Sequence, residues 1–247
     1  MSIPLIVFTT GVLMMVYEVT WPGRAWPPVT GWWARAAFLN GMQGLMVLVA
    51  GVTWDQWLMR HRLWSADVLG VTGGAIVGYL AITFIYYWWH RWRHEVQLLW
   101  RWFHQVHHSP QRIEIITSFY KHPFELLANS ILSSAILYLL VGLGPLAAVQ
   151  AVLLSGLAEL FYHWNVRTPY WLGYLFQRPE SHCVHHQEGL HSYNFGDLPV
   201  WDMLFGTFHN PGQWQERCGF GAENEQRLGA MLAGVDVHVV PVHVRSL

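Results

Sequence analysis

The chain has 247 residues, of which 53% are hydrophobic, 15% aromatic and 12% charged. The charged share is about half of that in ordinary globular proteins, so the chain has too little polar surface to cover itself in water and we expect lipid to surround part of it. A formal net charge of -1 provides no basic field for nucleic acid. With only Cys183 and Cys218, the sequence also excludes a disulfide framework, iron–sulfur clusters and cysteine-rich zinc modules.

Apolar segments of the sequence predict four or five membrane-spanning helices. The longest segment runs from Phe124 to about Tyr162, about twice the length that one helix needs to cross a hydrocarbon core of roughly 30 Å. Because Gly142, Gly144 and Pro145 lie near its middle, we expect a tight helical hairpin there. The other apolar segments comprise residues 3–17, 36–52 and 68–89.

Basic residues predict the orientation of these helices. If the N-terminus lies outside, 12 of the 14 Lys and Arg residues fall in cytoplasmic segments and only Arg60 and Arg62 lie outside, as the positive-inside rule requires. Eleven of the 15 histidines lie between His90 and His191, nearly all just beyond the ends of the predicted spans. We therefore expect an all-α integral membrane protein whose histidine-rich helical site and C-terminus are cytoplasmic.

Three histidine clusters carry the strongest functional signal. His90 and His94 form an HxxxH motif at the end of the third apolar segment, where this spacing places both imidazoles on one helical face. Residues 104–108 and 182–186 each form an HxxHH motif, and one further histidine lies where the last predicted span ends. Together these positions supply nine imidazoles: His90, His94, His104, His107, His108, His163, His182, His185 and His186.

The first two clusters are too far apart on a straight helix to share one site. His90 and His108 lie 18 residues apart, which a continuous helix would stretch to roughly 27 Å, whereas paired catalytic metals lie about 3.5–4 Å apart. The chain must therefore bend between His94 and His104. We also expect Pro123 in the first turn of the fourth span.

Metal coordination explains the clusters better than a structural role does. Burying nine imidazoles without partners would cost about 1–3 kcal/mol for each unpaired group. Two ions with four or five nitrogens each fit the donor count, whereas one tetrahedral zinc would leave five imidazoles over. Imidazole alone does not select between iron, zinc, copper and nickel, but a hydrolytic zinc protease would need HExxH, which the first motif lacks. We assign no role to the isolated histidines His61, His209, His238 and His243.

The sequence around these motifs resembles the membrane-bound fatty acid hydroxylase superfamily, which includes sterol desaturases, sterol methyl oxidases, sphingolipid hydroxylases and alkylglycerol monooxygenase. The resemblance covers roughly residues 80–210 and is collinear throughout. It rests on the segments YYWWHRWRH (86–94), LWRWFHQVHHS (99–109), KHP (121–123), HWN (163–165), RPESHCVHH (178–186), YNFG (193–196) and WDMLFGT (201–207).

This resemblance implies an enzyme with two iron ions that uses O2 to hydroxylate or desaturate an unactivated C–H bond of a membrane lipid, such as a fatty acyl chain or a sterol. It implies N-terminal transmembrane helices in residues 1–89 and a catalytic region in residues 90–210, which contains the helical hairpin 124–162. Residues 211–247 then form a C-terminal tail in which we expect no chemistry.

The resemblance also assigns roles to individual side chains. The nine clustered histidines take the family's iron-ligand positions. His122 is a candidate for an additional ligand or for a structural residue at the membrane interface, and His191 for a tenth ligand or for a hydrogen-bond partner of the ligands. Asn165 and Asn194 are candidates for hydrogen-bond partners that orient the imidazoles, as metal sites generally require. Related proteins often carry another acidic or histidine residue a few positions after His163, and its absence here leaves that position to water or His191.

Partners follow from what the sequence lacks. It contains no haem-binding domain and no flavin or nicotinamide fingerprint, so we expect electrons from a separate cytochrome, or from a ferredoxin with its reductase. Two alternatives remain open: a histidine-rich membrane protein that binds or transports metal, and a family member with the fold but no activity. Against transport, the histidines cluster outside the spans and not along a path through them.

Overall fold

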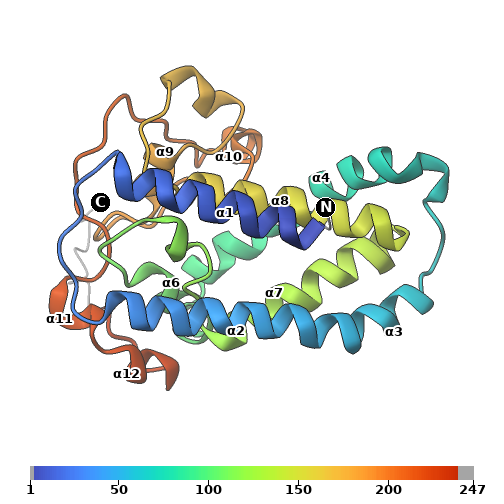
Figure 1. Ribbon diagram of the computed structural model, residues 1–247, viewed down its shortest axis with the longest axis horizontal. Helices are drawn as coiled ribbons and strands as arrows, with labels where there is room; N and C mark the ends of the chain where they lie inside the picture. Colours follow the sequence, from blue (N-terminus) through green and yellow to red (C-terminus); the bar gives the residue numbers. More distant parts are fainter. Residues whose placement is uncertain (1–2, 239–247) are drawn as a thin grey trace, which may run out of the picture.

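The computed structural model describes residues 3–238, and this part of the chain is helical, with one isolated β-bridge between Gln187 and Cys218. Five long helical segments run roughly along the long axis of the molecule (Figure 1). They are α1 (Ile3–Thr20), α2 (Trp32–Val52) with α3 (Trp54–Arg60), η1 (Asp67–Leu69) with α4 (Gly70–Glu95), α7 (Pro123–Ser134) with the π-helix η4 (Ala135–Leu140), and α8 (Pro145–His163).

Short helices gather at one end of these long segments, on the left in Figure 1. They are α5 (Gln97–Leu99), the π-helix η2 (Trp100–His104), α6 (Gln105–His108), η3 (Ile115–Thr117), η5 (Tyr170–Tyr174), α9 (Pro179–His185), α10 (Pro199–Phe205), α11 (Ala222–Glu225) and α12 (Leu228–Leu232).

Four helical segments in the described residues are long and apolar enough to cross a membrane: Trp32–Arg60, Asp67–Glu95, Pro123–Leu140 and Pro145–His163. The predicted all-α membrane fold is thus confirmed, at the lower end of the predicted range of spans. The first apolar segment forms α1, which is apolar at least over Phe8–Thr20.

The predicted hairpin between α7 and α8 is confirmed by the structure. Gly142 in its turn has a φ of +75°, a backbone conformation that glycine adopts without strain. A β-carbon at Gly142 would lie 2.5 Å from the Trp64 ring, so the turn has no room for a side chain at this position. Pro145 then occupies the first turn of α8, where a proline costs no hydrogen bond.

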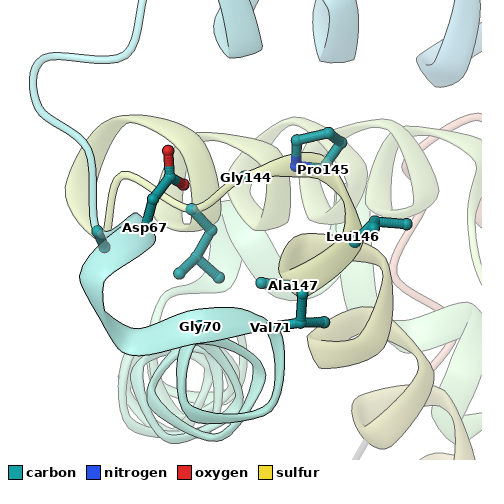
Figure 2. A pocket seen from close by; sticks show the side chains of 9 residues that line it. Asp67, Gly70, Val71, Gly144, Pro145, Leu146 and Ala147 are labelled. Atoms are coloured by element: carbon teal, nitrogen blue, oxygen red, sulfur yellow. The ribbon is translucent and has the colours of Figure 1, made fainter.

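A hollow of about 280 Å³ lies where this turn meets the start of α4 (Figure 2). Its lining consists of residues 66, 67, 70, 71 and 143–147, which include Asp67 but no histidine. This end of the molecule is opposite the end at which the histidine-bearing helices terminate (Figure 1). The hollow is therefore separate from the histidine site.

Small residues bring α4 and α8 together along the membrane-spanning part. Gly74 and Gly78 lie one helical turn apart on α4, and a β-carbon at Gly78 would lie 2.7 Å from Leu143 and 3.1 Å from Ala151. A β-carbon at Gly74 would lie 3.1 Å from Ala147. In lipid, helices associate through such close backbone approach because burial from water no longer drives them together.

The ends of three long helices meet at the histidine end of the molecule. His90 and His94 lie in the last turns of α4, Pro123 starts α7, and His163 ends α8. After α4 the chain reverses at Val96, which has extended φ and ψ values of −105° and 110°. The predicted bend between the first two histidine clusters is therefore confirmed.

The three regions expected from the sequence, residues 1–89, 90–210 and 211–247, share one hydrophobic core at this end. Its buried residues come from α2, from the segment after α4 and from the described part of the C-terminal tail: Trp32, Ala36, Leu39, Trp100, Val106, Tyr120, Phe220, Met231 and Val237. The tail, in which the sequence predicts no chemistry, is thus part of the packing that supports the histidine end.

We expect Gly78→Ala to destabilise the fold by about 1–3 kcal/mol, the usual cost of overpacking a tight contact. The matched control is Gly41→Ala on α2, where an added β-carbon meets nothing within 4 Å and alanine gains helix propensity. Thermal unfolding of both variants in detergent measures the difference. Equal stability of the two variants would contradict the proposed role of close α4–α8 packing.

Candidate metal centre

The structure brings the nine clustered histidines into two groups that could each hold a metal ion. Within each group, one ring nitrogen of every histidine lies within 4.8 Å of the others. Seven of the nine side chains are buried, and His90 and His94 are half-buried. The first group consists of His90, His94, His104, His108 and His185, and the second of His107, His163, His182 and His186.

Both HxxHH motifs contribute to both groups. In the first motif, His104 and His108 join the first group and His107 joins the second. In the other motif, residue 185 joins the first group and residues 182 and 186 join the second. The groups also touch, since the His108 and His186 rings stack with centroids 4.2 Å apart. Consecutive histidines point about 100° apart around a helix, so one short helix can serve two adjacent sites.

Backbone carbonyls hold one nitrogen of several imidazoles. The Nδ1 atom of His90 lies 2.7 Å from the Phe195 carbonyl, and that of His185 lies 2.8 Å from the Tyr193 carbonyl. His163 Nδ1 lies 2.9 Å from the carbonyl of residue 159. A carbonyl only accepts, so Nδ1 carries the proton in all three rings and Nε2 keeps its lone pair. This is the arrangement that metal-ligating histidines generally show.

The nitrogens that face into the groups include many buried atoms without a hydrogen-bond partner. Unpartnered atoms are Nε2 of His90, His104 and His185, Nδ1 of His107 and His186, and both ring nitrogens of His94 and His108. In the second group, His182 Nε2 lies 3.0 Å from His163 Nε2 and 3.1 Å from His186 Nε2. Two nitrogens at about 2.1 Å from one ion and at right angles to each other are about 3.0 Å apart, so the residues present fit a metal.

Burial also sets the charge state of these side chains. It lowers the pKa of His185 to about 3 and lowers the pKa of five other clustered histidines well below the ordinary value of 6.5: His104, His107, His108, His182 and His186. Neighbouring histidines or arginines add to the effect of burial. The imidazoles are therefore neutral at pH 7, which is the form that binds metal.

A buried ion pair supports the first group from the α7 side. Glu125, fully buried near the start of α7, pairs with Arg93 of α4. Its Oε1 lies 3.2 Å from His104 Nδ1, which also lies 3.1 Å from Arg93 Nη1. Sequence patterns did not single out Glu125, although a carboxylate inside a 39-residue apolar segment was the available signal, since such residues are costly unless paired.

Asp202 organises the loop that holds His90 and His185. Its carboxylate accepts hydrogen bonds from the backbone N–H groups of Phe195 at 2.7 Å and Gly196 at 2.9 Å. Thr207 donates a further hydrogen bond to it at 2.7 Å. Through this loop the buried carboxylate determines where the Phe195 carbonyl meets His90.

More than half of the chain, residues 75–207, matches the family model named fatty acid hydroxylase. The chain belongs to the fatty acid hydroxylase family. The match contains every residue of the two histidine groups. It therefore confirms the resemblance that the histidine motifs indicate.

Curated relatives of this chain carry the names of lipid-modifying enzymes. It is 36% identical over 166 residues to ornithine lipid hydroxylase OlsE of Rhizobium tropici, a match that covers 64% of this chain and 44% of the relative. It is 31% identical over 138 residues to alkylglycerol monooxygenase of Homo sapiens, a match that covers 53% of this chain and 29% of the relative. It is 32% identical over 126 residues to very-long-chain aldehyde decarbonylase GL1-9 of Oryza sativa subsp. japonica, a match that covers 49% of this chain and 48% of the relative. The matches thus cover less than half of each relative's length, and no significant match to a solved structure was found.

Two further histidines, His122 and His191, lie outside both groups. His122 was a candidate ligand, but its Nδ1 accepts a hydrogen bond from the Phe124 backbone N–H at 3.0 Å and so caps α7. His191, the other candidate, lies beside the first group, with its ring centroid 5.0 Å from that of His108. Its Nε2 faces His238 Nε2 at 3.4 Å, so the sequence missed a contact between His191 and the tail.

In the described part of the chain, the side chains of the two candidate asparagines bond to backbone groups and not to imidazoles. Asn165 accepts a hydrogen bond from the Arg24 backbone N–H and donates to the Arg24 carbonyl, so it fastens the α1–α2 linker. The Asn194 side chain bonds to the backbone of Ser181 and of residue 209. The contact with His182 Nδ1 comes instead from Gln177, at 2.9 Å, a residue that no sequence motif indicated.

We expect Glu125→Gln to weaken metal binding by about 10–100-fold, the usual effect of removing a partner of a metal ligand. The amide keeps the shape of the side chain but leaves Arg93 without its buried counter-charge. Glu95→Gln is the control, because Glu95 pairs with Arg91 on the exposed side of α4. Titration of the metal-free protein with Fe2+ measures both variants. Unchanged affinity in Glu125→Gln would contradict the supporting role of this carboxylate.

Proposed function

We propose that the protein is an O2-dependent di-iron oxidoreductase that hydroxylates an unactivated C–H bond of a membrane lipid. The observation that carries this proposal is the pair of histidine groups at the ends of membrane-spanning helices. Two relatives are named as a lipid hydroxylase and an alkylglycerol monooxygenase, which favours hydroxylation over desaturation and a fatty acyl or ether lipid over a sterol.

The proposed ligands are the nine residues of the two groups, with one iron in each. Iron supplies the redox chemistry with O2 that zinc lacks. The chain's own residues keep the imidazoles neutral by burial and orient them through the carbonyls of Phe195, Tyr193 and residue 159. The apolar walls of the spans would hold the acyl part of the lipid beside the histidines.

We further propose that the histidine end faces the cytoplasm. In the described part of the chain, the basic residues at the opposite end of the bundle are Arg60, the last residue of α3, and Arg62, which follows it closely. The positive-inside rule places the side with more basic residues in the cytoplasm. A separate cytochrome or ferredoxin system on that side would supply the electrons. Because the matches cover less than half of each relative's length, the activity of the whole protein is also part of this proposal.

We expect the chain, expressed in cells with a lipid mixture of known composition, to produce lipid species heavier by one oxygen atom. His107→Ala should reduce this product by about 100-fold or more, because loss of a mere hydrogen-bond partner of a metal ligand already costs up to about 100-fold in activity. His61→Ala is the control, because this exposed histidine belongs to neither group. Mass spectrometry of lipid extracts measures the outcome. An unchanged lipid profile from an iron-loaded protein supplied with reductant and O2 would leave a metal-binding protein or an inactive family member instead.

Metal content tests the two groups separately. We expect the parent chain to bind about two iron ions, and His94→Ala and His186→Ala each to lose about one of them, as in two-metal sites with independent ligand sets. Iron per chain, measured by plasma emission spectrometry on purified protein, decides this. Full iron content in either variant would show that the corresponding group is not a site.

A further inference from the structure

Two short helices outside the four membrane-spanning segments expose large apolar side chains. Exposed residues of η5 and the two positions after it are Tyr170, Trp171, Tyr174, Leu175 and Phe176, and those of α10 are Val200, Met203, Leu204 and Phe205. The charged residue within these stretches, Asp202, is fully buried. Monomeric proteins in water rarely expose an uninterrupted apolar surface of this kind.

The α10 helix packs against α4 at the depth of its membrane-spanning part. Trp201 donates from its ring N–H to the Thr83 hydroxyl at 3.1 Å, and its ring lies 5.0 Å from that of Phe84. Thr83 is six residues before Trp89, where the apolar part of α4 ends, which corresponds to about 9 Å along the helix. Figure 1 agrees, because α10 is drawn level with parts of α1 and α8 along the long axis and not beyond their ends.

The exposed face of α10 continues the lipid-facing surface of α4. Phe84 of α4 is 40% exposed although it lies within a membrane span, and it contacts Phe205 of α10 as well as Trp201. The η5 helix packs against α10, and the Tyr174 ring lies 5.7 Å from the ring of Phe208, which follows α10. Lipid that contacts α4 at this level therefore also reaches α10 and η5.

The composition of the two helices differs in the way that depth in a bilayer requires. The exposed residues in η5 itself are Tyr170, Trp171 and Tyr174, the residue types that concentrate at the level of the headgroups. Those of α10 are aliphatic residues, methionine and phenylalanine, which suit the acyl-chain region.

The inner side of α10 connects this surface with the histidine groups. Phe205 stacks on Tyr87 with centroids 5.1 Å apart, and Phe195 lies 6.2 Å from Tyr87 and 5.7 Å from the His90 ring. Asp202 of the same helix holds the loop that contains Phe195. One helix thus separates exposed apolar surface from the first histidine group.

We propose that α10 and η5 are embedded in the bilayer, with α10 among the acyl chains and η5 at the headgroups, so that lipid borders the histidine groups on this side. Membrane insertion is independent of the proposed function. One consequence rests on that function: a lipid substrate approaches the histidines from the bilayer along Phe205, Tyr87 and Phe195.

Site-specific fluorescence in nanodiscs of phosphatidylcholine and phosphatidylglycerol tests the proposal on the full chain. A solvent-sensitive fluorophore is attached at Leu204→Cys or Trp171→Cys, with Leu48→Cys in a span and Glu216→Cys in an exposed loop as references. Cys183 and Cys218 are buried, and the parent chain gives their background labelling. Thermal unfolding in detergent checks that each variant is folded, and Met203→Cys replaces Leu204→Cys if that variant is not.

We expect nitroxide-labelled lipid to quench the Leu204→Cys label as strongly as the Leu48→Cys label, and several-fold more than the Glu216→Cys label. The Trp171→Cys label should be quenched more by a headgroup nitroxide than by an acyl-chain nitroxide. Quenching by aqueous iodide in place of lipid nitroxide would overturn the proposal. A label at Leu204→Cys that neither quencher reaches would also overturn it, because a second copy or another protein would then cover this surface. None of these outcomes depends on catalytic activity.

Discussion

Neutral imidazoles whose lone pairs converge away from water are the constraint on which the rest of the structure depends. Each such nitrogen has lost hydrogen bonds to water, and most in the two groups have gained none from the protein. The cost is about 1–3 kcal/mol for each unpaired atom, so the arrangement persists only if the surrounding packing is strong and if a ligand repays the loss on binding. A metal ion is the ligand that takes several imidazole lone pairs at once.

The surrounding structure meets this constraint in two layers. In the membrane layer, small residues on α4 and α8 bring these helices close together, so that His90, His94 and His163 emerge at the same end. In the polar layer, short helices and loops supply the other histidines and the groups that hold them. Buried carboxylates contribute twice, Glu125 beside His104 and Asp202 behind the Phe195 loop. Neither layer suffices alone, since the ligand sets combine residues from both.

The success of the sequence predictions depended on how local the signal was. Apolar length predicted the spans, Gly142 and Pro145 the hairpin, and the separation of His90 from His108 the bend between clusters, because each is a property of a short stretch of chain. The partner of Asn165, the Arg24 backbone, is 141 residues away in the sequence, so no local pattern indicated it. His238 contacts His191, which is 47 residues away, whereas Gln177 lies only five residues before His182 and was missed because it belongs to no histidine motif.

The sequence by itself determined the membrane class, the family and the nine histidines, because apolar length and motif spacing are properties of the chain before it folds. Only the tertiary structure decided that these histidines divide into groups of five and four, with each HxxHH motif shared between both. Helical spacing predicts which histidines lie on one face of a helix, but not which other segments of the chain pack against that face. The packing of α6 and α9 between the ends of α4 and α8 directs His107 and His108 to different groups, and this packing rests on contacts between distant segments.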